Sequence, residues 1–260
     1  MGQILGLGVT HFPPLSGTDE NLGRILKRAL DDPAVPERMR DPSGWPAAMR
    51  EEYGVDAGLT AARHHREALL TGFRNARRVL DEFAPDFVVI WGDDQYENFK
   101  EDIIPPFCVL AYESLTTKPW QYYRGPNVWK EPTEKTFEYK GHRDAGKFIA
   151  SGMIESGFDV SYAYKPLHHQ LGHAFLTPKH YLLYPDVEAD RALYEALQAA
   201  DYATWRQRPL SAIEDSGQQE VLNWMCLVGA MNELGRRPTE TSYVQSYIFN
   251  SNKCFAVFEP

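Results

Sequence analysis

A histidine and a pair of aspartates in this sequence each follow a short apolar run, and both residue types can bind a metal ion. His11 ends the N-terminal apolar run and is followed by two prolines, whereas Asp93 and Asp94 follow the apolar run at 87–91. Because prolines end a strand, the His11 imidazole should lie at a sheet edge, where open α/β sheets bind ligands. Each motif alone fits an ordinary alternative, in which His11 caps a strand and the aspartates form a turn. Together the two motifs favour a metal site.

The elements that must position these residues alternate between strands and helices. Residues 3–9 and 87–91 are predicted strands, and the helical period of the apolar residues over 57–83 predicts a long helix between them. One such β-α-β unit favours a parallel sheet. We therefore predict an α/β fold with a mostly parallel central sheet flanked by helices, as a single domain over residues 1–260. The other predicted elements are a strand at 107–112, a helix at 143–156, a strand at 158–164, helices at 185–207 and 217–234, and one or two strands within 241–258.

Composition excludes several classes of function. The net charge of −9 leaves no basic excess to meet the phosphates of a nucleic acid. The sequence has no apolar run near the roughly 18 to 20 residues of a membrane span and no basic, apolar leader typical of secretion. Cys108, Cys226 and Cys254 are widely spaced among apolar neighbours, so we expect buried free thiols and a reducing cytoplasm.

The remaining histidines fall into two groups. His168, His169 and His173 directly follow a predicted strand, so we expect a loop cluster at the same sheet edge. The alternative is that one or two of them satisfy loop carbonyls. His64 and His65 lie among charged residues of the 57–83 helix, and we predict that both face solvent.

Glu188 lies on the first turns of a predicted helix. Its structural interpretation is favourable charge near a helix N-terminus. Its functional interpretation is a carboxylate metal ligand. Two neutral donors and one carboxylate on one face of Fe(II) leave positions that accept a chelating catecholate and dioxygen.

Five short motifs occur along the chain in an order that resembles one enzyme family. They are Val9-Thr10-His11-Phe12-Pro13, the run from Val88 to Gln95 with Phe99 and Ile103-Ile104-Pro105, Lys140-Gly141-His142, Gly172-His173, and Asn223-Trp224-x-x-Leu227-x-Gly229-Ala230. In this order they resemble the class III extradiol ring-cleavage dioxygenases, of the protocatechuate 4,5-dioxygenase type catalytic (beta) subunit. The motifs cover both ends and the middle of the chain.

The resemblance implies Fe(II), O2 and cleavage of a catechol ring next to its hydroxyls, with a protocatechuate-like or gallate-like aromatic substrate. It implies that His11 is the first metal histidine and Glu188 the metal glutamate. It also implies that His173 is the acid/base residue and that His142 lies near the substrate pocket. The resemblance further implies that the chain assembles as a homo-oligomer or as a hetero-oligomer with a small subunit.

Two departures from the family pattern matter. The second metal histidine falls near Gln95, where this chain offers Asp93, Asp94 and Gln95. Asp94 is the better Fe(II) ligand, so the predicted metal set is His11, Asp94 and Glu188, with Gln95 as an alternative. His173 and Glu188 lie only 15 positions apart. The chain is then either a reduced member with a smaller sheet or one that lost a segment and its activity.

Three functions are therefore compared. The leading one is an Fe(II)-dependent extradiol dioxygenase in which aromatic residues of 113–140 line or cover the ring pocket. The second is a non-catalytic member of the same fold that acts as a binding or partner subunit. The third is a metal-dependent hydrolase in which the predicted metal set activates water.

Overall fold

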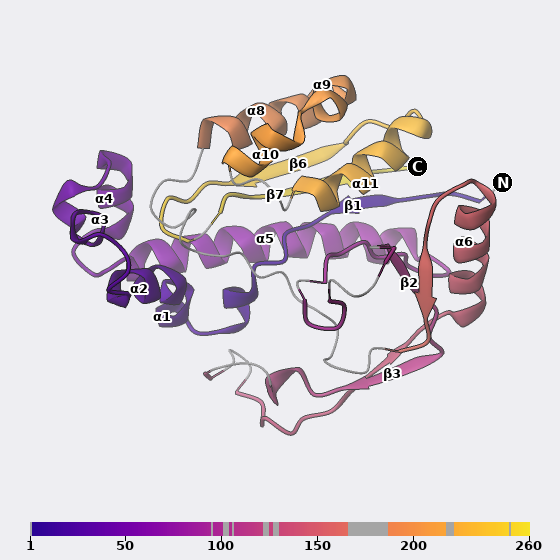
Figure 1. The fold of residues 1–260 in the computed structure, drawn as a ribbon, viewed down its shortest axis with the longest axis horizontal. Helices are drawn as coiled ribbons and strands as arrows, with labels where there is room; N and C mark the ends of the chain where they lie inside the picture. The colour runs from indigo at the N-terminus through magenta and orange to yellow at the C-terminus, as the bar shows by residue number, and fades with distance from the viewer. Residues whose placement is uncertain are drawn as a thin grey trace. The chain divides into compact units, whose positions relative to one another are not determined.

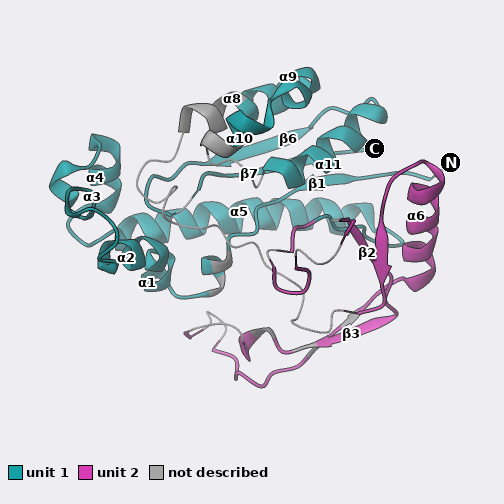
Figure 2. Cartoon of the chain, viewed as in Figure 1, with its two compact units in different colours: residues 1–91, 176–260 teal, residues 92–175 magenta. Residues whose placement is uncertain are grey.

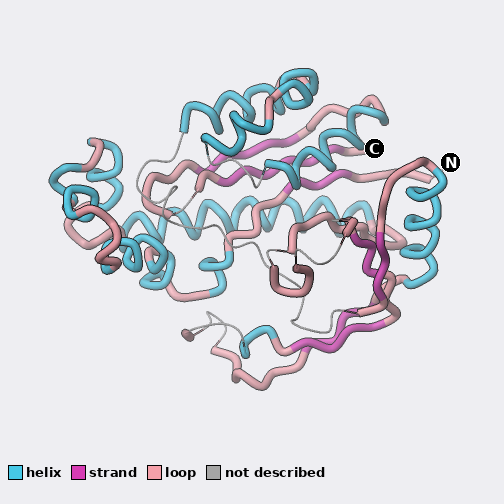
Figure 3. Tube along the Cα trace, viewed as in Figure 1, coloured by secondary structure: helices cyan, strands magenta, loops and turns pink. Residues whose placement is uncertain are grey.

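The computed structural model describes residues 2–94, 96–100, 104–105, 107–121, 125–126, 130–165, 187–216, 221–249 and 251–260. The chain divides into two compact units, coloured separately in Figure 2: unit 1 comprises residues 1–91 and 176–260, and unit 2 comprises residues 92–175. Helices and strands are both present (Figure 3), which confirms the predicted α/β class. That the whole chain forms one domain stays a prediction.

A three-stranded antiparallel sheet in the order β1-β7-β6 runs through unit 1 (Figure 1). β6 and β7 are consecutive strands joined by a short connection, which can only join antiparallel neighbours. β1 pairs with the other side of β7, with Leu7 opposite Val257. Parallel pairing, which we predicted for most of the sheet, occurs among the described strands only in unit 2. The strands of unit 1 are β1 (Gly6–Gly8), β6 (Glu240–Val244) and β7 (Lys253–Phe258).

Helices surround this sheet, and the long helix predicted over 57–83 is confirmed as α5. Short helices precede it in the chain, and Leu22, Trp45 and Met49 of these helices and their connections are buried in the core. The predicted helix at 185–207 is divided in two, because Ala200 has a φ of 55° and Asp201 caps the second part. The described helices of unit 1 are η1 (Pro13–Ser16), α1 (Asp19–Leu22), α2 (Arg24–Asp31), α3 (Glu37–Arg40), η2 (Pro42–Gly44), α4 (Ala47–Tyr53), α5 (Leu59–Phe83), α8 (Val187–Gln198), α9 (Tyr202–Gln207), α10 (Leu210–Ser216) and α11 (Val221–Glu233).

α5 and α11 cover opposite faces of the sheet (Figure 1). Glycines at the contacts show how closely the two helices approach. A Cβ at Gly8 would lie 2.2 Å from Cζ3 of Trp224, so β1 has no room for a side chain beneath α11. A Cβ at Gly72 of α5 would lie 2.5 Å from the Phe255 ring. Both glycines are therefore required by packing.

β7 is buried on both faces, which explains why its apolar residues run together instead of alternating with polar ones. Successive side chains of a strand point to opposite faces. Phe255 belongs to a core cluster with α5 and the N-terminal helices, whereas Ala256 and Phe258 belong to a second cluster with α8, α9 and α11. Because apolar burial stabilises by roughly 25 cal/mol per Å², this strand is central to the stability of unit 1.

Unit 2 contains the parallel pair that a β-α-β unit produces. β2 pairs with β5, and α6 lies between them in sequence, as a parallel connection requires. A Cβ at Gly146 would lie 2.8 Å from Cα of Ala111, so α6 packs directly beside the end of β2. The elements of unit 2 are β2 (Cys108–Leu110), β3 (Ser114–Thr117), η3 (Pro119–Gln121), β4 (Phe137–Lys140), α6 (Arg143–Glu155) and β5 (Ser161–Ala163), with β3 and β4 forming an antiparallel hairpin.

The apolar run at 87–91 forms no strand, so the prediction of a buried strand there was wrong. Each of its side chains is exposed, from 42% for Val89 to 85% for Ile90. An apolar run becomes a strand only where a neighbouring strand takes up its backbone N–H and C=O groups. The run itself does not specify that neighbour.

Two further expectations concern the cysteines and the membrane. Cys108, Cys226 and Cys254 are free thiols, as expected, but they are half-buried and not fully buried. None of the helices in the described parts of the chain combines the length and apolar character that crossing a membrane requires.

Candidate functional site

His11 lies just beyond β1, as the sequence predicted. β1 ends at Gly8 and η1 begins at Pro13, so His11 lies in the short connection between them. Its side chain is exposed, whereas the next residue, Phe12, is buried. The connection therefore presents an imidazole at the surface and anchors its neighbour in the core.

Phe12 is held by three buried side chains, and we call Phe12, His65, Phe249 and Lys253 the Phe12 cluster. Nζ of Lys253 lies 4.0 Å from the centroid of the Phe12 ring. The His65 ring meets the Phe12 ring edge-on at 5.8 Å and lies 4.9 Å from the Phe249 ring. A desolvated cation over an aromatic face stabilises by about 2 kcal/mol, so Lys253 contributes more here than an exposed lysine would.

The charge of Lys253 is compensated inside the core. The residue is 2% exposed, and Nζ donates to the carbonyl oxygen of Phe249 at 2.5 Å and to that of Ser251. A buried ammonium group requires such partners, because burial removes its hydration. Both carbonyls belong to the connection between β6 and β7. Lys253 therefore fixes this connection and the Phe12 ring together.

The prediction that His64 and His65 both face solvent was wrong for His65. His64 is exposed, but His65 is only 4% exposed on the buried face of α5. The signal was present in the sequence, since His65 lies four residues before the buried Leu69 and therefore on the apolar stripe of the helix. Lys253 was missed as well, although strand alternation places it on the same face as Phe255.

Burial decides the protonation states around the Phe12 cluster. Desolvation, with a further contribution from Lys253, lowers the pKa of His65 from 6.5 to about 2, so the ring is neutral. Its Nε2 has no hydrogen-bond partner within the described residues. Glu52 of α4 accepts from the Tyr247 amide at 2.5 Å. Burial raises the pKa of Glu52, although its hydrogen bonds and Lys253 act in the opposite direction.

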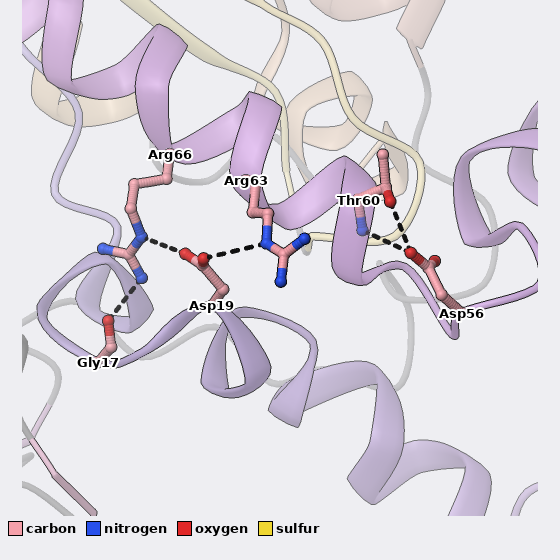
Figure 4. Close-up of polar contacts among 6 residues, drawn as sticks. All are labelled: Gly17, Asp19, Asp56, Thr60, Arg63 and Arg66. Atoms are coloured by element: carbon pink, nitrogen blue, oxygen red, sulfur yellow. Dashed lines mark hydrogen bonds and ion pairs between the residues drawn. The ribbon is translucent and has the colours of Figure 1, made fainter.

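Arg66 of α5 binds the segment that follows His11, and Figure 4 shows its contacts with Gly17 and Asp19. Its guanidinium donates to the carbonyl oxygens of Leu15 at 2.6 Å and Gly17 at 2.5 Å. Its Nε donates to the Asp19 carboxylate at 2.6 Å, and Nε of Arg63 lies 3.7 Å from the other oxygen of Asp19. Because one guanidinium joins three points of the segment after His11, that segment is tied to α5.

Asp94 forms a turn. Such a turn was the ordinary alternative to a role of this residue as a metal ligand. One carboxylate oxygen accepts from the amides of Asn98 at 2.9 Å and Phe99 at 3.1 Å, and the other accepts from Nδ2 of Asn98 at 3.1 Å. An ionised carboxylate offers about four acceptor sites, so the turn engages most of them. A metal ion would have to use the remainder or replace these contacts, and the ligand role of Asp94 stays a prediction.

His142 caps the N-terminus of α6. Its Nδ1 accepts from the Ala145 amide at 3.0 Å, and its side chain is exposed. A ring nitrogen that accepts a hydrogen bond carries no proton, so the hydrogen-bond pattern assigns the proton of the neutral ring to Nε2. Its expected place near a substrate pocket stays a prediction.

The structure describes the other predicted site residues only in part. His168, His169, His173 and Gln95 lie outside the described residues. Glu188 is described in its backbone alone, on the first turn of α8. His11 and Glu188 belong to unit 1 and Asp94 to unit 2. The described residues contain no group of three or more histidines, cysteines, aspartates or glutamates placed to hold a metal, so the predicted metal set stays a prediction.

The chemistry of the predicted donors nevertheless suits Fe(II). Imidazole nitrogen and carboxylate oxygen are both common ligands of non-haem ferrous iron. If Asp94 took the place that a second histidine has in the resembled family, it would add one negative charge to the predicted set. That charge would favour binding of a divalent cation and change the electron density that the ion receives.

Comparison with known proteins relates part of this chain to dioxygenases of dihydroxylated aromatic acids. No protein-family model matches the chain. A Rhodococcus sp. protein named 2,3-dihydroxyphenylpropionate/2,3-dihydroxicinnamic acid 1,2-dioxygenase is 30% identical over 97 residues, which are 37% of this chain and 27% of that protein. A protein of the same name from Rhodococcus jostii (strain RHA1) is 33% identical over 92 residues, 35% of this chain and 25% of that protein.

A Pseudomonas putida relative with the corresponding name is 28% identical over 110 residues, 42% of this chain and 30% of that protein. The chain therefore spans less than a third of the length of these relatives. The similarity relates part of the chain to enzymes named as dioxygenases, and it does not extend over their whole length.

Proposed function

We propose that this chain is a non-haem Fe(II) extradiol dioxygenase that inserts O2 into a catechol-type ring and cleaves the ring beside its hydroxyls. The observation that carries the proposal is its similarity to proteins named 1,2-dioxygenases of 2,3-dihydroxyphenylpropionate. In a 2,3-diol, the bond between carbons 1 and 2 lies next to the hydroxyl pair and not between the hydroxyls. The names of these relatives thus describe extradiol cleavage. The motifs around His11 and His173 resemble those of a family that carries out the same reaction.

His11, Asp94 and Glu188 would hold the ion, with Gln95 as the alternative second ligand. Bound Fe(II) would supply coordination positions at which the two catechol oxygens and O2 meet. The exposed position of His11, three residues after the end of β1, supports its part in this set, because an ion held there could be reached by a substrate and O2.

Two histidines would handle protons. His173 would act as the base that removes a proton from a catechol hydroxyl and as the acid that returns it later. His142 carries its proton on Nε2 when neutral, because Nδ1 accepts from Ala145. We therefore assign His142 the role of a hydrogen-bond donor to a substrate oxygen, and not that of a second base.

The substrate class is a catechol, with protocatechuate, gallate and 2,3-dihydroxyphenylpropionate as the compounds to compare. The aromatic segment 113–140 would line or cover the ring. The connection between β3 and β4 is held by polar contacts, in which Lys118 pairs with Glu134 at 2.8 Å and Nε1 of Trp120 donates to Glu131 at 2.9 Å. Such a covering segment would exclude water from a ring pocket, and assembly with further subunits would exclude more.

The test is anaerobic reconstitution with Fe(II), followed by metal analysis and O2 uptake with these catechols. We expect iron binding and O2 uptake with formation of a yellow ring-fission product, both lost in His11→Ala. His64→Ala is the matched control, because it removes an exposed histidine from the same unit. Absence of O2 uptake with every catechol, in protein that contains Fe(II), would contradict the proposal.

The Asp94 turn favours a second candidate, a non-catalytic member of the same fold that binds an aromatic ligand or a partner subunit. A carboxylate that already accepts three N–H groups is a complete structural element without a metal. This candidate predicts a folded protein that binds a catechol but retains no iron after reconstitution. The same metal analysis distinguishes the two.

A further inference from the structure

The segment from His11 to Asp19 is anchored at two places. Phe12, directly next to His11, is buried in the Phe12 cluster. Leu15, Gly17 and Asp19 are joined by the guanidinium of Arg66. His11 is thus an exposed side chain on a backbone that is held immediately after it.

The first anchor combines contacts from two distant parts of the chain. His65 comes from α5, and Lys253 comes from the first position of β7. The Lys253 ammonium lies over the Phe12 ring at 4.0 Å and also binds carbonyl oxygens of the β6-β7 connection. A cation that is fixed by carbonyls on one side and faces an aromatic ring on the other restricts how far that ring can move.

The second anchor is the more specific of the two. The guanidinium of Arg66 is planar and presents its N–H groups in a fixed fork, and here they reach two carbonyls and a carboxylate. Figure 4 draws the contacts with the Gly17 carbonyl and the Asp19 carboxylate. The side chain is 16% exposed, so water competes little for these donors. A lysine at this position could not reproduce the fork, because its three donors radiate from one nitrogen.

We propose that Arg66 and Lys253 are positioning residues for His11. The inference rests on the proposed function, because His11 needs a fixed position only if it binds a metal ion. Metal ligands are held in orientation by groups beyond them, and loss of such a group typically weakens metal binding by about 10- to 100-fold. Neither residue contacts the ion in this proposal. Each acts through the backbone on which His11 lies.

The experiment measures Fe(II) affinity by anaerobic titration calorimetry in Arg66→Ala. The matched control is Arg74→Ala, which removes an exposed arginine that pairs with Glu67 on the same helix. We expect Arg66→Ala to bind Fe(II) about 10- to 100-fold more weakly. We expect Arg74→Ala to bind it as tightly as the wild type. Hydrogen exchange in the peptide 11–19 should become faster in Arg66→Ala but not in Arg74→Ala.

Lys253 provides a second, independent pair of variants. Lys253→Met removes the cation and should weaken Fe(II) binding, whereas Lys253→Arg retains a cation near the Phe12 ring and should restore it. Leu197→Ala, in the other core cluster, lowers stability without touching the 11–19 segment and should leave the affinity unchanged. This control separates positioning from general destabilisation. If Lys253→Met does not fold, Arg66→Ala decides the question.

The outcomes separate the inference from the proposed function. If the wild type binds Fe(II) through His11 and both Arg66→Ala and Lys253→Met bind it equally tightly, the inference is overturned and the proposed function stands. If the wild type binds no Fe(II), or His11→Ala binds it as tightly as the wild type, the proposed function is overturned and the inference with it.

Discussion

The two units hold their predicted site residues by different means. In unit 1, the residues beside His11 are fixed by α5 and β7, so Arg66 reaches Gly17 across 49 positions of sequence. In unit 2, Asp94 is bound by an amide only four positions away, and His142 by one three positions away. Unit 1 therefore positions its site residue through tertiary packing, and unit 2 through local turns and caps.

Burial follows the same division. Unit 1 contains two hydrophobic core clusters that share the sheet between them. Among the described residues of unit 2, the buried side chains are those of Asn98, Ala111 and Ala150. It follows that substitutions in unit 1 should cost more stability than comparable substitutions in unit 2.

The largest difference is expected for apolar side chains. Leu69 is fully buried in unit 1, and Leu69→Ala should lower the free energy of unfolding by about 2 to 5 kcal/mol through lost burial and a cavity. Phe148 in unit 2 is 80% exposed, and Phe148→Ala should change it by less than about 0.5 kcal/mol. Urea unfolding of both variants measures the difference. Equal losses of unfolding free energy would contradict the proposed difference between the two units.

Glycine substitutions sharpen the comparison of the two units. A Gly→Ala change should lower the free energy of unfolding in unit 1 and raise it in unit 2. Gly8→Ala would drive a Cβ to 2.2 Å from Trp224 and should lower the free energy of unfolding by about 1 to 3 kcal/mol. Gly152 of α6 borders open space, with nothing within 4 Å of the point that a Cβ would occupy, so Gly152→Ala should raise it by up to about 1 kcal/mol. Thermal or urea unfolding decides the sign, and a stabilised Gly8→Ala would contradict the packing described.

The pH dependence of the free energy of unfolding tests whether His65 of the Phe12 cluster is buried in its neutral form. The folded-state pKa of His65 is lowered from 6.5 to about 2, so the unfolded chain takes up a proton in this window and the folded chain does not. The contribution of His65 to stability is therefore complete above pH 6.5 and is lost as the pH falls, at about 1.4 kcal/mol per pH unit. Glu52, with a raised pKa, acts with the opposite sign.

The measurement is the difference in unfolding free energy between wild type and His65→Phe from about pH 7 to about pH 5, since the Glu52 contribution is common to both. We expect this difference to change little above pH 6.5 and to approach about 1.4 kcal/mol per pH unit well below it. Phe148→Ala, which removes no titratable group, is the control and should follow the wild-type curve. A His65→Phe curve parallel to that of the wild type would show that His65 titrates freely.

The smallest expected effect lies in the Asp94 turn. Asp94→Ala removes the acceptor of three N–H groups and should lower the free energy of unfolding by about 1 kcal/mol. Hydrogen exchange should increase at the amides of Asn98 and Phe99 but not in β7. Asp94→Asn keeps one carbonyl acceptor and should fall between wild type and Asp94→Ala. Faster exchange in β7 as well would show that the effect of the substitution is not confined to this turn.

Features encoded within one element were predicted correctly from the sequence. The period of apolar residues predicted α5 and α11, and the prolines after His11 predicted the end of β1. The candidate site was predicted less completely. His11 is where it was expected, whereas the gathering of His11, Asp94 and Glu188 into one metal site stays a prediction, because the described residues contain no such group.

Only the tertiary structure decided which elements meet. The run at 87–91 has the composition of a buried strand but forms none, and His65 and Lys253 are ionisable residues that pack against Phe12 in the core. The physical reason is that periodicity determines which face of an element is apolar. Which partner covers that face, and whether a polar side chain on it finds compensating contacts, depends on residues far away in the chain.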